Sequence, residues 1–170
     1  MLHGARRRLQ EIRKVAVVNS AKATSLNRRF NKFGWAWVML CVALAVHVAD
    51  EAATDFLSVF NSSVRAVHER LPFLPLPVFE FRPWLSGLIL AVAVLLAMSP
   101  LAFHRARPMI YAARAFAVLM LLNGLGHVLG SIYLGRLMPG VYSAPLLLAC
   151  SINLLAATDE AGGLKYEKHH

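Results

Sequence analysis

The sequence predicts an all-α fold, a four-helix transmembrane bundle that follows a basic N-terminal arm. Of the 170 residues, 58% are hydrophobic, against roughly 45–50% in soluble domains. The apolar residues also cluster: residues 85–98 and 141–158 carry no charge, and residues 111–138 carry only two arginines. Apolar runs of nearly 20 residues are typical of membrane-spanning helices. A soluble protein of this size could not bury so many apolar helices in one core.

The positive charge is concentrated before the first apolar segment. Residues 1–33 hold nine Lys and Arg residues and one acid, Glu11. A basic arm can bind nucleic acid, but beside a membrane span it favours retention on the cytoplasmic side. We therefore expect a basic cytoplasmic arm (1–33), a membrane domain (34–158) and a polar tail (159–170), with no nucleic-acid partner. Four spans place both termini in the cytoplasm, with the protein in the inner or plasma membrane.

The first two predicted helices are separated by prolines. The first should begin near Phe33 or Gly34 and continue to about Glu69, because its hydrophobic pattern persists through Phe60 and its last turns can lie outside the hydrocarbon. Three prolines within residues 71–77 then favour an extended path along the membrane surface. Pro83 suits the first turn of the second helix, which should end near Ala97, before Ser99-Pro100.

The third and fourth predicted helices are joined by a glycine-rich turn. The third should cover about Met109 to Tyr133 and the fourth about Val141 to Ala157, with a tight turn at Gly135–Gly140 between them. The two cysteines, Cys41 and Cys150, fall inside apolar segments and are expected to be packing residues.

Polar residues interrupt the first apolar segment. His47, Glu51 and Asp55 are spaced four apart and share one helix face, with Asp50 to one side. An unpaired ion at the centre of a membrane helix costs about 2.5–3.5 kcal/mol on insertion scales. These side chains should therefore face the bundle interior.

The third helix supplies a second polar pair, Asn123 and His127, also four apart. Small residues let helices approach closely in membranes, so the neighbouring glycines should let this helix pack against the first. That contact would bring His127 opposite His47 and Glu51. The glycines are Gly124, Gly126 and Gly130.

Two histidines and several carboxylates from two helices resemble the inward-facing ligands of metal sites in bundle cores. We expect His47, Glu51 and His127 to hold zinc, iron or manganese. The candidate catalytic carboxylates are Glu51, Asp50 and Asp55, and Asn123 is expected to orient a ligand. The substrate of such an enzyme would be lipid-like or apolar, because the site is reached from the bilayer.

A non-enzymatic interpretation accounts for the same pattern. A His-x-x-x-Glu pair inside a bundle can be an internal network that fixes helix packing. The protein would then be a ligand binder, a proton-coupled carrier or an assembly subunit. The substrate, the reaction and the oligomeric state are left open by the sequence.

The stretch His47-Val-Ala-Asp50-Glu51 resembles the motif of the HXXEE-domain membrane proteins, with Asp50 in place of the first Glu. Asn123-x-x-x-His127 resembles the second polar pair of that family, and Pro139-Gly140-Val141-Tyr142-Ser143 resembles its Pro-Gly turn. The similarity covers about residues 35–157. The resemblance supports the polar site and implies no particular reaction, because the family has no settled biochemical function.

Overall fold

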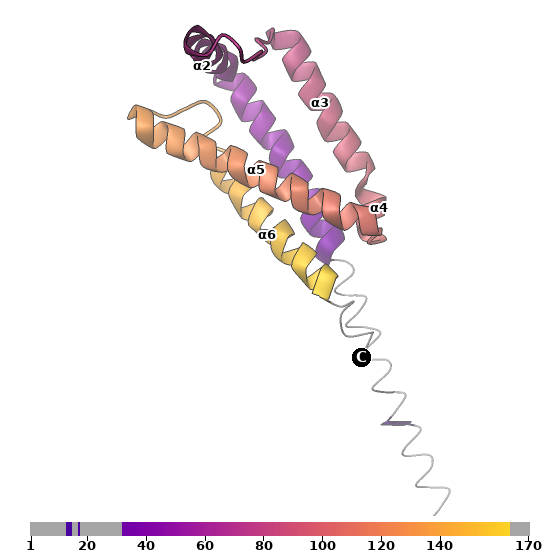
Figure 1. Ribbon diagram of the computed structural model, residues 1–170. Helices are drawn as coiled ribbons and strands as arrows, with labels where there is room; N and C mark the ends of the chain where they lie inside the picture. The colour runs from indigo at the N-terminus through magenta and orange to yellow at the C-terminus, as the bar shows by residue number, and fades with distance from the viewer. Residues whose placement is uncertain (1–12, 15–16, 18–31, 164–170) are drawn as a thin grey trace, which may run out of the picture.

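The computed structural model describes residues 13–14, 17 and 32–163, and all of its regular elements in these ranges are helices (Figure 1). The all-α prediction is therefore confirmed for the described part of the chain. The basic arm falls almost entirely outside it. The elements are a first helix (Lys32–Ala53, unlabelled in Figure 1), α2 (Phe56–Arg70), α3 (Phe81–Ala97), α4 (Ser99–Phe103), α5 (Arg107–Leu134) and α6 (Ala144–Gly163).

Three helical stretches are long and apolar enough to cross a membrane: Lys32–Ala53, Phe81–Phe103 and Arg107–Leu134. Only 6% of the most apolar window of Phe81–Phe103 is buried inside the protein, so its side chains would expose a large apolar surface to water. In a bilayer this surface contacts lipid, so the free-energy cost of exposing it to water is avoided. The predicted fourth span, α6, is not among the three. It carries the polar residues Asn153, Asp159 and Glu160.

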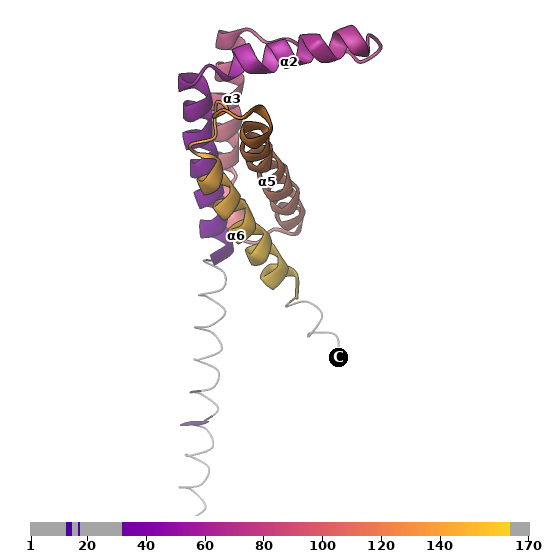
Figure 2. The same cartoon turned by 90° about the vertical axis from the view of Figure 1, so that its left-hand side faces the viewer.

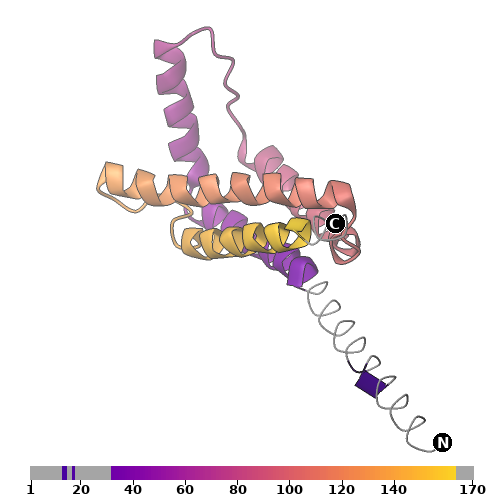
Figure 3. The same cartoon turned by 60° about the horizontal axis from the view of Figure 1, so that its bottom comes forward.

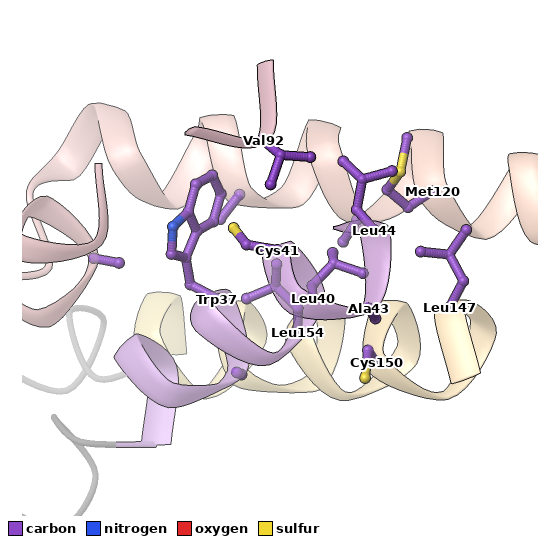
Figure 4. Close-up of a cluster of buried hydrophobic side chains, with 14 of the residues drawn as sticks. Trp37, Leu40, Cys41, Ala43, Leu44, Val92, Met120, Leu147, Cys150 and Leu154 are labelled. Carbon is purple, nitrogen blue, oxygen red and sulfur yellow. The ribbon is translucent and has the colours of Figure 1, made fainter. Parts of the chain in front are cut away.

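The buried face of the first helix forms the centre of the core (Figure 4). Trp37, Leu40 and Leu44 recur at helical spacing and are at most 8% exposed. The same stripe continues to His47 and Glu51, so the polar pair lies at one end of an apolar seam. Residues from the other helices that complete this cluster include Val92 of α3, Met120 of α5, and Leu147, Cys150 and Leu154 of α6. Both cysteines are buried, as expected of packing residues.

The first helix does not continue to Glu69, so that prediction is wrong. It ends at Ala53, and Asp55 adopts a left-handed conformation (φ 57°) that breaks the backbone path. Thr54 lies at the break, where its hydroxyl donates to the Asp50 carbonyl (2.6 Å) and accepts the N–H of Gly140 (3.2 Å). A contact with the connection between α5 and α6 therefore accompanies the end of the helix.

Helix α2 runs crosswise over one end of the bundle (Figure 2). The proline-rich segment that follows it returns to α3 without regular structure, as predicted. Asn61 holds this segment to α2, because its side-chain amide donates to the Phe79 carbonyl (2.9 Å) and accepts the Phe79 N–H (3.1 Å). The segment is apolar and exposed, which suits a membrane surface.

Helix α3 ends at Ala97 as predicted, but a short helix that we did not expect, α4, follows at once. Pro100 occupies its first turn, where a missing N–H costs no helical hydrogen bond. The Leu95 carbonyl, near the junction, also accepts the indole N–H of Trp37 (3.0 Å). This bond joins the first helix to the end of α3.

Helices α5 and α6 form a hairpin that runs along one side of the bundle (Figure 3). Gly135 ends α5 in a left-handed conformation (φ 61°), as is common after a helix. Helix α6 begins at Ala144 and reaches Gly163, later at both ends than expected, so the predicted polar tail is helical at its start. An ion pair between Arg114 of α5 and Asp159 accompanies this extension.

The glycines of α5 do not pack against the first helix, contrary to our prediction. A Cβ on Gly124 would lie 3.0 Å from Leu148 Cγ, so this glycine faces α6. A Cβ on Gly130 would meet Met138 in the following turn, and Gly126 faces open space. Small residues let helices approach closely in membranes. Here they allow close contacts within the α5–α6 hairpin.

Candidate metal site

The site lies at the end of the bundle where the first helix meets the connection between α5 and α6. His47 and Glu51 occupy the last two turns of the first helix, and His127 lies on α5. The structure brings these three side chains together, as the sequence predicted. One nitrogen from each histidine and one carboxylate oxygen lie within 4.8 Å of one another.

Glu51 Oε1 is the centre of this group. It lies 3.1 Å from Nε2 of His127 and 3.5 Å from Nε2 of His47. The two imidazole rings meet edge to face, with centroids 4.7 Å apart. Each histidine therefore presents the same ring nitrogen to the same carboxylate oxygen.

The group is shielded from solvent. The exposed fractions of the side chains are 0% for His47, 5% for His127 and 8% for Glu51. Gly140 covers one side so closely that a Cβ there would lie 2.8 Å from His127 Cε1 and 3.0 Å from Glu51 Cγ. The ring of Phe56, at the start of α2, lies 5.7 Å from that of His127.

The proton on His127 is fixed by a backbone carbonyl. Nδ1 of His127 lies 2.6 Å from the oxygen of Pro139. A carbonyl can only accept, so Nδ1 carries the hydrogen. In the neutral ring, Nε2 is then a bare lone pair that faces Glu51 Oε1.

His47 is oriented by a relay through Ser143 to Asp50. Asp50 Oδ2 accepts both the backbone N–H (2.9 Å) and the hydroxyl (2.7 Å) of Ser143. Because the single hydroxyl proton is directed to the carboxylate, the serine oxygen accepts from Nδ1 of His47 (2.8 Å). This leaves Nε2 of His47 bare, and within the described part of the chain it is buried with no hydrogen-bond partner.

With both rings neutral, three acceptor atoms therefore converge, and the shortest separation, between His127 Nε2 and Glu51 Oε1, is 3.1 Å. Such an arrangement requires a cation, which can be a proton or a metal ion. Zinc bonds to nitrogen and oxygen of about 2.0–2.2 Å place tetrahedral ligands about 3.3 Å apart. The two separations from Glu51 Oε1, 3.1 and 3.5 Å, fit that spacing. Nδ1 of His127 donates to a backbone carbonyl, and Nδ1 of His47 donates to Ser143, which in turn bonds to the Asp50 carboxylate. Metal-binding histidines usually have such partners on the ring nitrogen that does not bind the metal.

The other predicted site residues lie outside the group of three. Asp50 is half-buried and contacts Ser143, which makes it a partner of His47 and not of the converging atoms. Asp55 is exposed at the helix break, where its side chain makes no capping hydrogen bond to α2. Asn123 is half-buried, and the bonds that orient Nδ1 of each histidine come from Pro139 and Ser143 instead.

The sequence did not predict Ser143 as a partner of the histidines. It lies directly before α6, and its hydroxyl contacts both His47 and Asp50 across more than 90 positions of sequence. The available signal was its position at the end of the Pro139-Gly140 turn. A serine before a helix ordinarily indicates a cap, so nothing local distinguished this one.

Replacing Ser143 with alanine should lower metal affinity about 10–100-fold, the usual cost of removing a partner behind a metal ligand. The substitution removes the acceptor that fixes Nδ1 of His47. Competition with a chromophoric chelator measures the affinity. Ser131→Ala is the matched control, because its hydroxyl bonds to the His127 backbone carbonyl and not to a ligand ring. Equal affinities in the two variants would contradict the orienting role of Ser143.

Comparison with curated proteins and with solved structures returned no match. Comparison with protein families did: one family model covers residues 37–154, from Trp37 in the core to Leu154 in α6. That range contains His47, Glu51 and His127 as well as the Ser143 relay. The chain belongs to the family described as "Protein of unknown function with HXXEE motif".

Proposed function

We propose that this protein is an integral membrane protein that binds one divalent metal ion through His47, Glu51 and His127. The observation that supports it is the convergence of two imidazole nitrogens on one carboxylate oxygen in a buried site, where Nε2 of His47 has no hydrogen-bond partner among the described residues. Nδ1 of each ring has a hydrogen-bond partner, Pro139 or Ser143, so both donor nitrogens are already oriented. Zinc, iron and manganese all accept this ligand set.

We further propose that the protein is an enzyme. Three protein ligands leave a coordination position for water or substrate, as in catalytic sites. A bound zinc would supply an activated water, and a bound iron would supply oxygen chemistry. The residues themselves orient the ligands, through Pro139 and Ser143, and exclude bulk water, through Gly140 and Phe56.

The surroundings of the site favour a lipid-like or apolar substrate. The ring of Phe56 lies 5.7 Å from that of His127 and stacks on that of Trp84 of α3, with centroids 6.0 Å apart. Phe60 and Phe79 extend these aromatic contacts toward the exposed segment after α2. An apolar molecule that approaches from the bilayer would therefore meet apolar rings before the metal site.

One observation favours the metal-free alternative. The separation of 3.1 Å between His127 Nε2 and Glu51 Oε1 is also that of a proton-mediated hydrogen bond. In that case a protonated histidine and a carboxylate form an internal ion pair that fixes the contact between the first helix and α5. The protein would then be a binder, a carrier or an assembly subunit.

Metal analysis of the purified full-length protein separates the two proposals. The metal proposal expects close to one zinc, iron or manganese per chain, a loss of thermal stability on chelation, and no metal in Glu51→Gln or Glu51→Leu. Both variants should still insert and remain helical, because neither residue breaks a helix. Metal-free protein whose stability is unchanged by chelator would favour the ion pair.

We also propose that α6 crosses the membrane as a fourth span, so that both termini lie in the cytoplasm of the inner or plasma membrane. The nine basic residues before the first span support this orientation. Helix α2 and the metal site would then lie toward the opposite face. Single cysteines at Ser20 and Lys165 should resist a membrane-impermeant maleimide in intact cells, whereas Ser62→Cys on α2 should react. Labelling at Lys165 but not Ser20 would show that the number of spans is odd.

A further inference from the structure

We propose that the groove between the first helix and α6 binds one phospholipid whose head group carries both a phosphate and an ammonium, of the phosphatidylethanolamine class. The inference rests on the proposed membrane insertion of the bundle and is independent of the metal. The groove has a volume of about 450 Å³. From the first helix it is lined by residues between 32 and 39, at the opposite end of the described helix from His47 and Glu51.

Among the described residues that line the groove, one is basic and one is acidic. Lys32 is the first described residue of the first helix, and Glu160 lies in the last described turn of α6. Their ion pair is long, at 3.9 Å, and both side chains are at least half exposed. Exposed pairs of this kind contribute little stability, so a ligand can separate them at small cost.

The walls of the groove match the depth profile of a lipid. Trp35 is 58% exposed and lines the groove with Lys32, as suits an aromatic residue at the membrane interface. Met39 and Asn153 are each seven residues from the charged residue on their own helix, about 10 Å deeper along it. Asn153 is exposed there in an otherwise apolar wall. Its amide offers a hydrogen-bond partner to a polar group of a lipid that lies in the groove.

Charge complementarity selects the head group. The phosphate pairs with the Lys32 ammonium, and the lipid ammonium donates to the Glu160 carboxylate. A free phosphate would satisfy Lys32 and leave the apolar walls uncovered. A phosphatidylglycerol head group would leave Glu160 without a cation, and a choline head group cannot donate a hydrogen bond to it. A second copy of the chain would have to bury Lys32, Glu160 and Asn153 in an apolar contact.

Native mass spectrometry of the full-length detergent-solubilised protein tests the proposal, with phosphatidylethanolamine, phosphatidylcholine and phosphatidylglycerol added in turn. We expect one bound phosphatidylethanolamine, held about tenfold more tightly than the other two lipids, the difference that one charge-assisted hydrogen bond supplies. Lys32→Gln should weaken all three lipids. Glu160→Gln should remove only the preference for phosphatidylethanolamine, and Asn153→Leu should weaken all three without changing their order.

Arg65→Gln and Glu69→Gln are matched controls, because both residues are exposed on α2 at the other end of the bundle. They should bind lipid as the unmodified protein does. Equal binding of the three lipids, no effect of Lys32→Gln, or a dimer that binds no lipid would each overturn the proposal. Recovery of the protein in the soluble fraction would overturn the membrane placement as well, whereas loss of lipid preference in a membrane-inserted protein overturns this inference alone.

Discussion

Replacing His127 with alanine should abolish metal binding while the helices remain in place. The substitution removes one of the three donor atoms that converge at the site. It also leaves the Pro139 carbonyl without the ring N–H that it accepts. We therefore expect a larger loss of affinity than the roughly 10–100-fold that follows removal of a partner behind a ligand. Elemental analysis measures the metal, and circular dichroism measures the helix content.

His68→Ala is the control for this experiment. His68 is exposed on α2, and its ring lies near the Leu74 carbonyl, away from the group of three. It should keep the metal content of the unmodified protein. A His127→Ala protein that retained its metal would show that the ion is bound elsewhere and would remove His127 from the site.

Replacing Gly140 with alanine should destabilise the protein and disturb the metal site together. Gly140 has φ 82°, a conformation that costs other residues roughly 1–2 kcal/mol. The added Cβ would also lie 2.8 Å from His127 Cε1 and 3.0 Å from Glu51 Cγ, so these side chains would have to move. We expect a fall in the unfolding temperature in detergent and a measurable loss of metal affinity.

Gly135→Ala separates the two effects. Gly135 also has a positive φ (61°), but a Cβ there would meet nothing within 4 Å. This variant should lower the unfolding temperature, because alanine disfavours a positive φ, and it should leave the metal affinity unchanged. If Gly140→Ala and Gly135→Ala bound metal equally, Gly140 would have no part in shaping the site.

Helical spacing predicted the central part of the site. His47 and Glu51 are four residues apart, which placed them on one face of a helix regardless of its partners. The scarcity of other polar groups in the apolar segments then pointed to His127. Residues 81–97 were similarly well predicted, because Pro83 and Ser99-Pro100 mark both ends locally.

The remaining features depend on contacts that no local pattern encodes. The first helix ends where Thr54 meets the backbone of Gly140, 86 residues away. Asp50 is a partner of His47 only because Ser143 lies between them. The glycines of α5 were assigned to the wrong neighbour. Their spacing shows that one helix face carries small residues, but it does not show which helix packs against that face.

X-ray absorption spectroscopy at the edge of the bound metal tests the central claim most directly. Purified protein with close to one metal per chain should give a first shell of nitrogen and oxygen atoms only, with the outer-shell scattering of two imidazole rings. His47→Ala should remove one of those rings from any metal that remains. A shell containing sulfur, a spectrum without imidazole scattering, or protein that binds no metal at all would contradict a metal ion held by His47, Glu51 and His127.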